Sequence, residues 1–196
     1  MLDVNIYRMK TTDSSSKRAM ESLDEITADK AACAHRLVAE YGDRLYETAI
    51  RLCGNESDAG DYVFRTLERA IERVDGFKGR ASLFTWLYEI MVNLMRTDAR
   101  RKAANALTFP GELPECEDPR PNAGAALDAK TEAEVVQAAI RELSPPLRAA
   151  VVFRYYEDMT VSEIAHILSV PEGTVMRRLY DAKNIIRRRI ERMILP

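Results

Sequence analysis

The last third of this chain constrains its fold most, because helix start signals follow one another there at short intervals. Ser144 before Pro145 predicts a helix N-terminus, since proline lacks only an N–H group that would be unpaired in the first turn. That helix is expected to end near Tyr156. Thr160 and Glu163 then have the spacing of a capping box, in which each side chain bonds the backbone N–H of the other. A second, short helix is therefore predicted directly after the first.

A third helix is predicted after a break at 169–171, because Pro171 disfavours helical geometry in the residue before it. Apolar residues recur in this helix at three- and four-residue steps, which indicates one buried face. The buried face is predicted to consist of Val175, Leu179, Ala182, Ile186 and Ile190, and the short helix before it to turn inward Ile164, Ala165 and Leu168.

The opposite face of this third helix is polar and rich in arginine. Residues 171–196 contain seven Lys or Arg and three Asp or Glu, an excess that suits contact with phosphates. Such a face is often merely solvated, but here it follows a short helix and a tight turn, the arrangement that places a second helix in the major groove. We predict that this recognition helix contacts DNA through Glu172, Thr174, Met176, Arg177, Arg178, Tyr180, Asp181 and Lys183.

The charges along the chain indicate its domains. Residues 44–102 carry a net charge of +2 and residues 141–196 one of +3, whereas residues 103–140 between them carry −5. The acidic stretch contains four prolines and little apolar periodicity, which predicts a flexible or extended linker. The predicted organisation is an N-terminal tail at 1–27, a helical domain at 28–102, a linker at 103–127 and a second helical domain at 128–196.

The first domain is predicted to contain three helices. The first of them repeats apolar residues at helical steps, namely Leu37, Tyr41, Leu45, Ala49 and Leu52, before Gly54 and Asn55 interrupt the pattern. Ser57 or Asp58 is expected to cap the next helix, which ends before Gly76 and Gly79. A third helix begins near Ser82, contributes Phe84 and Trp86 to the core, and ends in a basic run. The predicted fold class is all-α: two small helical domains joined by a flexible acidic linker.

Several segments in a fixed order resemble one known family. In the second domain they are Leu143-Ser144-Pro145, Phe153 to Glu157, Ser162 to Ala165, Gly173-Thr174-Val175, Arg178-Leu179 and Ala182-Lys183. In the first domain they are Tyr41, Leu45-Tyr46, Ala49, Gly54, Asp58-Ala59, Asp61, Phe77-Lys78-Gly79, Phe84 to Leu87, Ile90, Asn93, Asp98 and Arg101. The ordered set, over roughly residues 28–102 and 128–192, resembles bacterial RNA polymerase sigma factors of the extracytoplasmic-function (ECF) group.

The resemblance implies partners and roles. The second domain would be a winged-helix-like sigma region 4 that reads the −35 promoter element as duplex and meets the β flap. The first would bind the β′ clamp of core RNA polymerase and read the −10 element on the separated nontemplate strand. Asn93 would receive a flipped-out base, whose unstacking a polar pocket must offset, and Arg96, Arg100 and Arg101 would hold nearby phosphates. The linker would lie toward the RNA path, and an anti-sigma factor is an expected partner.

The chain departs from the family pattern on the second helix of the first domain. Phe64-Arg65 stands where the family usually has Gln-Glu, so an apolar-basic pair replaces a polar-acidic one. The surface of Asp61, Phe64 and Arg65 is the one that the resemblance assigns to polymerase binding. An altered docking surface, or a sigma-like protein with a changed partner, is therefore an open alternative.

Other classes of protein fit the residues less well. An enzyme is not expected, because His35 and His166 lie in different predicted domains and no Gly-rich phosphate loop follows a strand. Cys33, Cys53 and Cys116 lack zinc spacing, so they are interpreted as two buried thiols and a linker thiol, with no metal and no cofactor expected. A stand-alone dimeric regulator would leave the first domain without a task, and a polymerase-binding adaptor would bind polymerase without opening promoters.

The chain carries no predicted membrane segment. No apolar run approaches the roughly 20 residues that span a bilayer, and no secretory signal pattern begins the sequence. A cytoplasmic location without membrane insertion is therefore expected.

Asp181 is a carboxylate within the basic face, and it generates a prediction. A carboxylate repels phosphate but accepts a hydrogen bond from cytosine N4, so Asp181 is expected to select a base more than to add affinity. Replacing Asp181 with alanine should change the preferred base at one position of the bound sequences, as read by selection from a duplex library and sequencing. Unchanged preference at every position would contradict this role.

Overall fold

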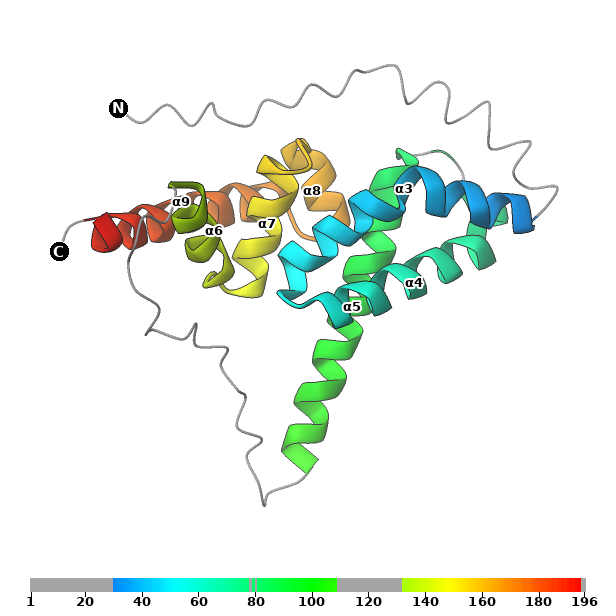
Figure 1. The fold of residues 1–196 in the computed structure, drawn as a ribbon, viewed down its shortest axis with the longest axis horizontal. Coiled ribbons are helices and arrows are strands. Elements are labelled where there is room, and N and C mark those ends of the chain that lie inside the picture. Colours follow the sequence, from blue (N-terminus) through cyan, green and yellow to red (C-terminus); the bar gives the residue numbers. More distant parts are fainter. Residues whose placement is uncertain (1–29, 78, 80, 109–131, 195–196) are drawn as a thin grey trace.

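The computed structural model describes residues 30–77, 79, 81–108 and 132–194, and the secondary structure there is entirely helical (Figure 1). The predicted tail at 1–27 and most of the predicted linker lie outside these residues. The first domain consists of α3 (Lys30–Cys53), α4 (Glu56–Arg73), a 3₁₀ turn at Val74–Gly76 and α5 (Leu83–Thr108). The second consists of α6 (Glu132–Arg141), α7 (Pro145–Tyr155), α8 (Val161–Ile167) and α9 (Glu172–Ile194).

The turn between α3 and α4 differs from the expectation in its cap. Gly54 ends α3 at a φ of 86°, in the left-handed region that glycine adopts at little cost. The N-cap of α4 is Asn55, whose side chain accepts from the Asp58 N–H at 2.7 Å, so the predicted caps at Ser57 and Asp58 are wrong. Asp58 instead accepts a 2.8 Å hydrogen bond from the Asn55 amide. Asn55, which was expected only to interrupt the apolar pattern together with Gly54, is therefore the residue that caps α4.

Helix α5 is longer than the sequence pattern indicated. The Ser82 hydroxyl accepts from the Thr85 N–H at 3.1 Å and so marks the predicted start. The helix continues past residue 102 to Thr108, so the first residues of the predicted linker are helical. Figure 1 shows this C-terminal part of α5 projecting from the body formed by the other helices.

The second domain follows its predicted signals closely. Pro145 is the first residue of α7, although the Ser144 side chain makes no capping hydrogen bond. The capping box at α8 is complete: the Glu163 carboxylate accepts from the Thr160 N–H at 2.8 Å, and the Thr160 hydroxyl accepts from the Glu163 N–H at 3.3 Å. Ser169 takes a φ of 47° in the turn before α9, which completes the helix-turn-helix.

The main hydrophobic core is continuous between the two domains. On the first-domain side it contains Leu45, Leu87, Tyr88 and Met91, and on the second-domain side Phe153, Ile164 and Ile167, all essentially without solvent contact. The rings of Tyr88 and Phe153 meet edge to face with centroids 5.3 Å apart. A smaller cluster of Ile140, Leu143, Val151 and Ala182 belongs to the second domain alone. The domains are therefore packed against each other, not merely tethered.

The capping box supplies a stability prediction. Thr160→Ala removes the acceptor for the Glu163 N–H and one side of a reciprocal pair, so the free energy of unfolding should fall by about 1 kcal/mol. Urea unfolding followed by circular dichroism measures this. Ser162→Ala is the control. It removes an exposed hydroxyl two residues further along the chain and should change the free energy of unfolding by much less. Equal losses in the two variants would contradict the capping role.

Candidate nucleic-acid interface

The recognition helix α9 exposes a mixed apolar and basic face. Met176 and Tyr180 are 62% and 67% exposed, unusual for side chains of this size, and Arg177 and Lys183 are also exposed. Val175 and Ala182 on the opposite face are fully buried, and they hold the helix against α7 and α8. The orientation predicted from the helical period is therefore present.

Not every predicted contact residue on α9 is equally accessible. Thr174, Arg178 and Asp181 are half-buried, and Glu172 is exposed at the helix N-terminus. Arg177 Nε lies 3.8 Å from the Asp181 carboxylate, an exposed i,i+4 pair that contributes little to stability and leaves both groups able to exchange partners.

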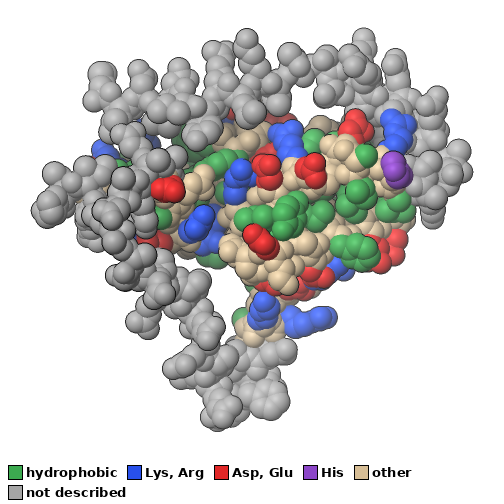
Figure 2. Space-filling view, viewed as in Figure 1, with side chains coloured by type: hydrophobic (Ala, Val, Ile, Leu, Met, Phe, Trp, Pro, Cys, Tyr) green, Lys and Arg blue, Asp and Glu red, His purple; other side chains and the backbone are tan. Residues whose placement is uncertain are grey.

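The basic end of α5 places three of the four predicted −10 residues at the surface. Asn93, Arg100 and Arg101 are exposed, and Figure 2 shows Lys and Arg side chains on the projecting part of this helix. Arg96 is different, because its guanidinium donates a hydrogen bond to the backbone carbonyl of Leu168 at the end of α8. Burial lowers the pKa of Arg96, and the nearby cations Arg178 and Arg100 lower it further.

The predicted polymerase surface on α4 consists of an exposed aromatic ring beside a charge cluster. Phe64 is 66% exposed, the ring projecting from the helix. The Arg65 guanidinium donates one hydrogen bond to the Asp61 carboxylate at 2.9 Å and another to the Asp98 carboxylate of α5 at 2.7 Å. The hydrogen bonds from Arg65 hold the pKa of Asp98 below its usual value and raise that of Arg65. The net charge that Arg65 presents to a partner is therefore largely neutralised, and the apolar ring dominates the surface.

A buried charge cluster joins the two domains, and the sequence did not reveal it. Glu157 follows α7 and is 6% exposed. Its carboxylate accepts from Arg44 Nε at 2.7 Å, from the Thr48 hydroxyl at 2.5 Å and from the Tyr88 hydroxyl at 2.7 Å. All three donors lie on α3 and α5. We call these four residues the interdomain latch. A glutamate at a helix end is ordinarily solvated, so only its surroundings distinguish this one.

Further polar contacts between the domains flank the latch. Arg148 of α7 donates to the Leu52 carbonyl at the end of α3 at 3.1 Å and to the Leu143 carbonyl at 3.1 Å. Burial lowers the pKa of this guanidinium. On the other side, His166 Nε2 of α8 lies 3.6 Å from the Glu89 carboxylate of α5.

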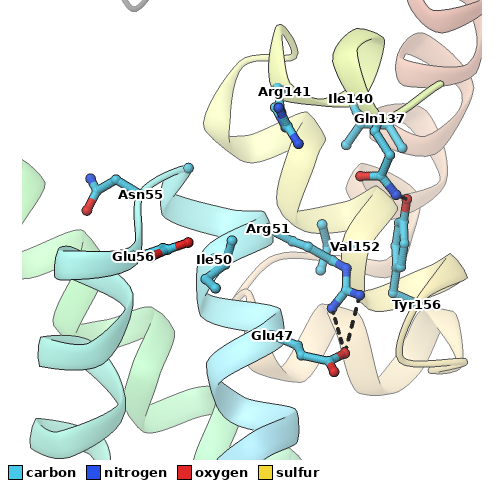
Figure 3. A pocket seen from close by; sticks show the side chains of 11 residues that line it. Glu47, Ile50, Arg51, Asn55, Glu56, Gln137, Ile140, Arg141, Val152 and Tyr156 are labelled. Atoms are coloured by element: carbon cyan, nitrogen blue, oxygen red, sulfur yellow. Dashed lines mark hydrogen bonds and ion pairs between the residues drawn. The ribbon is translucent and has the colours of Figure 1, made fainter. Parts of the chain in front are cut away.

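Two hollows lie along this interdomain boundary. One, of about 500 Å³, has walls from the α3–α4 turn and from α6 and α7; Figure 3 shows Arg51 bonded to Glu47 within it, and Gln137 directed at Tyr156. The other, open and of about 540 Å³, is lined by Glu89 of α5 and by Glu172 and the turn before α9. Each hollow is lined by residues of both domains, although Glu89 is the one first-domain residue in the lining of the second.

No metal site or reactive-thiol site is assembled among the described residues. His35 and His166 are both exposed, and no cluster of three metal-binding side chains occurs among the described residues. Cys53 is only half-buried, so the interpretation of it as a buried thiol is only partly correct, and burial raises its pKa. The Cys33 side chain and Cys116 lie outside the described residues. No helix within the described ranges has the length and apolarity to cross a membrane.

The fold and these faces define a two-domain helical protein that presents a helix-turn-helix on one domain and a basic helix end on the other. Sequence profiles of known families agree: the one described as Sigma-70 region 2 matches residues 37–105, and Sigma-70, region 4 matches residues 133–186. The chain belongs to the sigma-70 family of RNA polymerase sigma factors, in its ECF group.

Individual relatives are moderately similar over most of the chain. It is 33% identical over 168 residues to the ECF RNA polymerase sigma factor SigE of Mycolicibacterium smegmatis, covering 83% of this chain and 64% of SigE. It is 27% identical over 171 residues to the ECF RNA polymerase sigma factor SigW of Bacillus subtilis, covering 79% of this chain and 87% of SigW.

Two solved structures share the fold. One is the sigma factor RpoE of Bartonella quintana in complex with the anti-sigma factor NepR, with a TM-score of 0.60 and 23% identity, covering 78% of this chain and 90% of that one. The other is CnrH in complex with the cytosolic domain of CnrY, with a TM-score of 0.59 and 19% identity, covering 86% and 94%.

The Arg65–Asp98 pair generates a pH prediction. Because the pKa of Asp98 is lower in the folded protein than in the unfolded chain, its contribution to stability is complete above pH 4 and disappears as the pH falls through the folded pKa. Asp98→Asn should therefore lower the free energy of unfolding at pH 7 by up to about 1 kcal/mol, and the difference from the wild type should shrink below pH 4. Urea unfolding across pH measures it, with exposed Asp75→Asn as control. A difference independent of pH would contradict the pairing.

Proposed function

We propose that this protein binds core RNA polymerase and directs it to specific promoters, reading the −35 element with α9 and the −10 element as single strand with α5. The observation that carries the proposal is the presence, on one chain, of an exposed recognition-helix face and an exposed basic helix end, each within its matching family region. A single DNA-binding domain could not bind two promoter elements.

At the −35 element, the exposed face of α9 offers both base and phosphate contacts. Met176 and Tyr180 provide apolar surface for thymine methyl groups, and Arg177 can donate two hydrogen bonds to guanine. Asp181 can accept from cytosine N4, while Arg178 and Lys183 neutralise phosphates. Thr174 and Glu172, near the helix N-terminus, complete the surface.

At the −10 element, exposed Asn93 provides both a donor and an acceptor for the edge of an unstacked base. Arg100 and Arg101 lie on the same helix beyond it and provide charge for the backbone of a single strand. Arg96 belongs to the same set but must first leave the Leu168 carbonyl.

The surface on α4 fits the clamp of the polymerase as an apolar contact. Phe64 projects from the helix, and Arg65 is already paired with Asp61 and Asp98. The departure from the family pattern therefore changes the chemistry of this surface from polar to aromatic. Its task in the proposal is to insert a ring between apolar side chains of the β′ clamp.

The remaining partners and the compartment follow from the same proposal. The protein has no catalytic centre of its own and acts in the cytoplasm by binding, since the polymerase performs the chemistry. We further infer that an anti-sigma factor controls it. The similar structure of the sigma factor RpoE in complex with the anti-sigma factor NepR supports this inference.

Transcription with purified components tests the function. The chain is mixed with core polymerase and a library of random upstream sequences, and the RNAs are sequenced; we expect initiation from templates that share two spaced elements. Phe64→Ala should weaken polymerase binding by about tenfold, the effect of losing one buried aromatic anchor. Val38→Ala, which truncates another exposed apolar side chain on α3, is the control. Failure to bind core polymerase and to initiate anywhere would refute the proposal; binding without initiation would indicate an adaptor.

A further inference from the structure

Helix α9 is longer than the part of it that the proposed function uses. It runs from Glu172 to Ile194, whereas the region 4 match ends at residue 186 and the predicted DNA contacts end at Lys183. We call residues 183–191 the distal half of α9. It contains four cations and one carboxylate, namely Lys183, Arg187, Arg188, Arg189 and Glu191. Apart from Lys183, these charges have no task in the proposed function.

The two halves of α9 differ in net charge. In the proximal half, residues 172–182, two arginines are matched by two carboxylates, so the net charge is zero. In the distal half, four cations against one carboxylate give a net charge of +3. Contacts to base edges select a sequence, whereas neutralised phosphates provide much of the affinity for duplex DNA. The half of the helix that is expected to face the bases therefore lacks the charge that binding requires, and the distal half has it.

The distal cations lie on the same exposed face as the predicted base contacts. One stripe of side chains follows steps of four, three and four residues, which keep it on one side of the helix: Met176, Tyr180, Lys183 and Arg187. Arg188 is exposed beside this stripe. On the opposite face, Ile186 packs against the small hydrophobic cluster of the second domain. The charged end of the face is therefore held in a fixed orientation relative to the base-reading end.

The length of α9 places its distal cations near the DNA backbone. A rise of about 1.5 Å per residue places Arg187 roughly 17 Å beyond Met176, and the major groove is about 12 Å wide. A helix that reads bases with its N-terminal residues thus carries its distal cations to the phosphates that border the groove. Figure 1 shows the C-terminal part of α9 at the opposite end of the molecule from α4, and Arg187 and Arg188 are exposed there.

Arg187 and Arg188 are not committed to a carboxylate within the described part of the chain. Arg188 Nε donates to the Asn184 carbonyl at 3.2 Å, and Arg187 makes a longer contact of 3.5 Å with the Asn184 side chain. No carboxylate among the described residues forms an ion pair with either guanidinium. Arg189 differs, because it is paired with Glu142 just after α6. The helix dipole does not account for the two unpaired arginines, since its attraction for cations is confined to the last turn.

We propose that the distal half of α9 is a phosphate clamp, in which Arg187 and Arg188, together with Lys183, hold the DNA backbone beside the −35 element. The clamp supplies affinity that does not depend on sequence, and the proximal half of the same helix selects the bases. Duplex DNA is the occupant because these cations continue the base-reading face and no exposed large apolar side chain accompanies them, as a protein interface would require. The position of the clamp on a promoter rests on the proposed function.

Binding of duplex DNA across salt concentrations tests the clamp on the full-length chain without polymerase. The probe is a short, fluorescent, random-sequence duplex, and anisotropy measures its affinity between about 50 and 200 mM salt. Combining Arg187→Gln with Arg188→Gln should weaken binding by about tenfold or more at the lowest salt. It should also reduce the slope of log affinity against log salt by about 2, because two phosphate contacts are lost. Glutamine is a good helix former, and circular dichroism establishes that helix content is retained.

Arg189→Gln is the matched control. It removes the same charge from the same helix, but from a side chain that Glu142 already neutralises. Its affinity for the duplex and its salt slope should stay close to those of the wild type. If Arg189→Gln costs as much per charge as the double variant does, net charge alone sets the affinity and the clamp is refuted. An unaltered affinity and salt slope in the double variant would refute it directly.

Selection from a duplex library by the complex with core polymerase separates the clamp from base reading. The double variant should prefer the same sequence as the wild type while binding every sequence more weakly. Tyr180→Ala, which removes apolar surface but no charge, should alter the preferred sequence and leave the salt slope unchanged. An altered preference in the double variant would assign Arg187 and Arg188 to base reading and would overturn the clamp.

The clamp and the proposed function can fail separately. Salt slopes are measured on the free chain, so they judge the clamp whatever the polymerase does, and transcription from the random library judges the sigma function. A reduced slope in the double variant, with no transcription from the wild type, would refute the function alone. Weaker transcription by the double variant with unchanged duplex binding would refute the clamp and indicate an acidic protein surface as the partner of these arginines.

Discussion

A single buried carboxylate, Glu157, is the interaction on which the arrangement of the two domains depends. It comes from the turn after α7, and every donor that satisfies it comes from α3 or α5. Because an unpaired charge cannot remain in the interior, the carboxylate either keeps all of these partners or returns to water. The apolar contact of Tyr88 with Phe153 is aligned by the same constraint, since the Tyr88 hydroxyl is one of the donors.

The distribution of the other charges is consistent with a protein that works by presenting faces to partners. Arg65 is neutralised by Asp61 and Asp98, which leaves Phe64 as the dominant feature of its surface. The cations on α9 and at the end of α5 remain mostly exposed, whereas Arg96 and Arg148 are used between the domains. Whether an arginine reads DNA or holds the fold therefore depends on which carbonyl or carboxylate lies within its reach.

The sequence predicted the local structure well because the relevant signals act over a few residues. The capping box at Thr160 and the proline at the start of α7 were correct. Of the face of α9 that was predicted to be buried, Val175 and Ala182 are buried, whereas Leu179, Ile186 and Ile190 are half-buried. Local reasoning failed where neighbouring residues have similar preferences for the N-cap position, as Asn55, Ser57 and Asp58 do. It also failed where no helix-breaking residue marked the end of α5. The exposed and buried faces of α9 and α4 could be assigned from the helical period. The hydrogen bond from Arg96 to the carbonyl of Leu168, more than seventy residues further along the chain, could not be predicted in this way.

By itself, the sequence determined the helices, the face that each one buries, and the family to which the two domains belong, since capping and periodicity are properties of neighbouring residues. Only the tertiary structure decided that the domains share one core, that Glu157 is buried, and that a cation assigned to DNA is engaged elsewhere. The physical reason is that the free energy of a charged side chain depends on solvent exclusion and on partners brought from distant positions. Neither quantity is encoded in the spacing of residues along the chain.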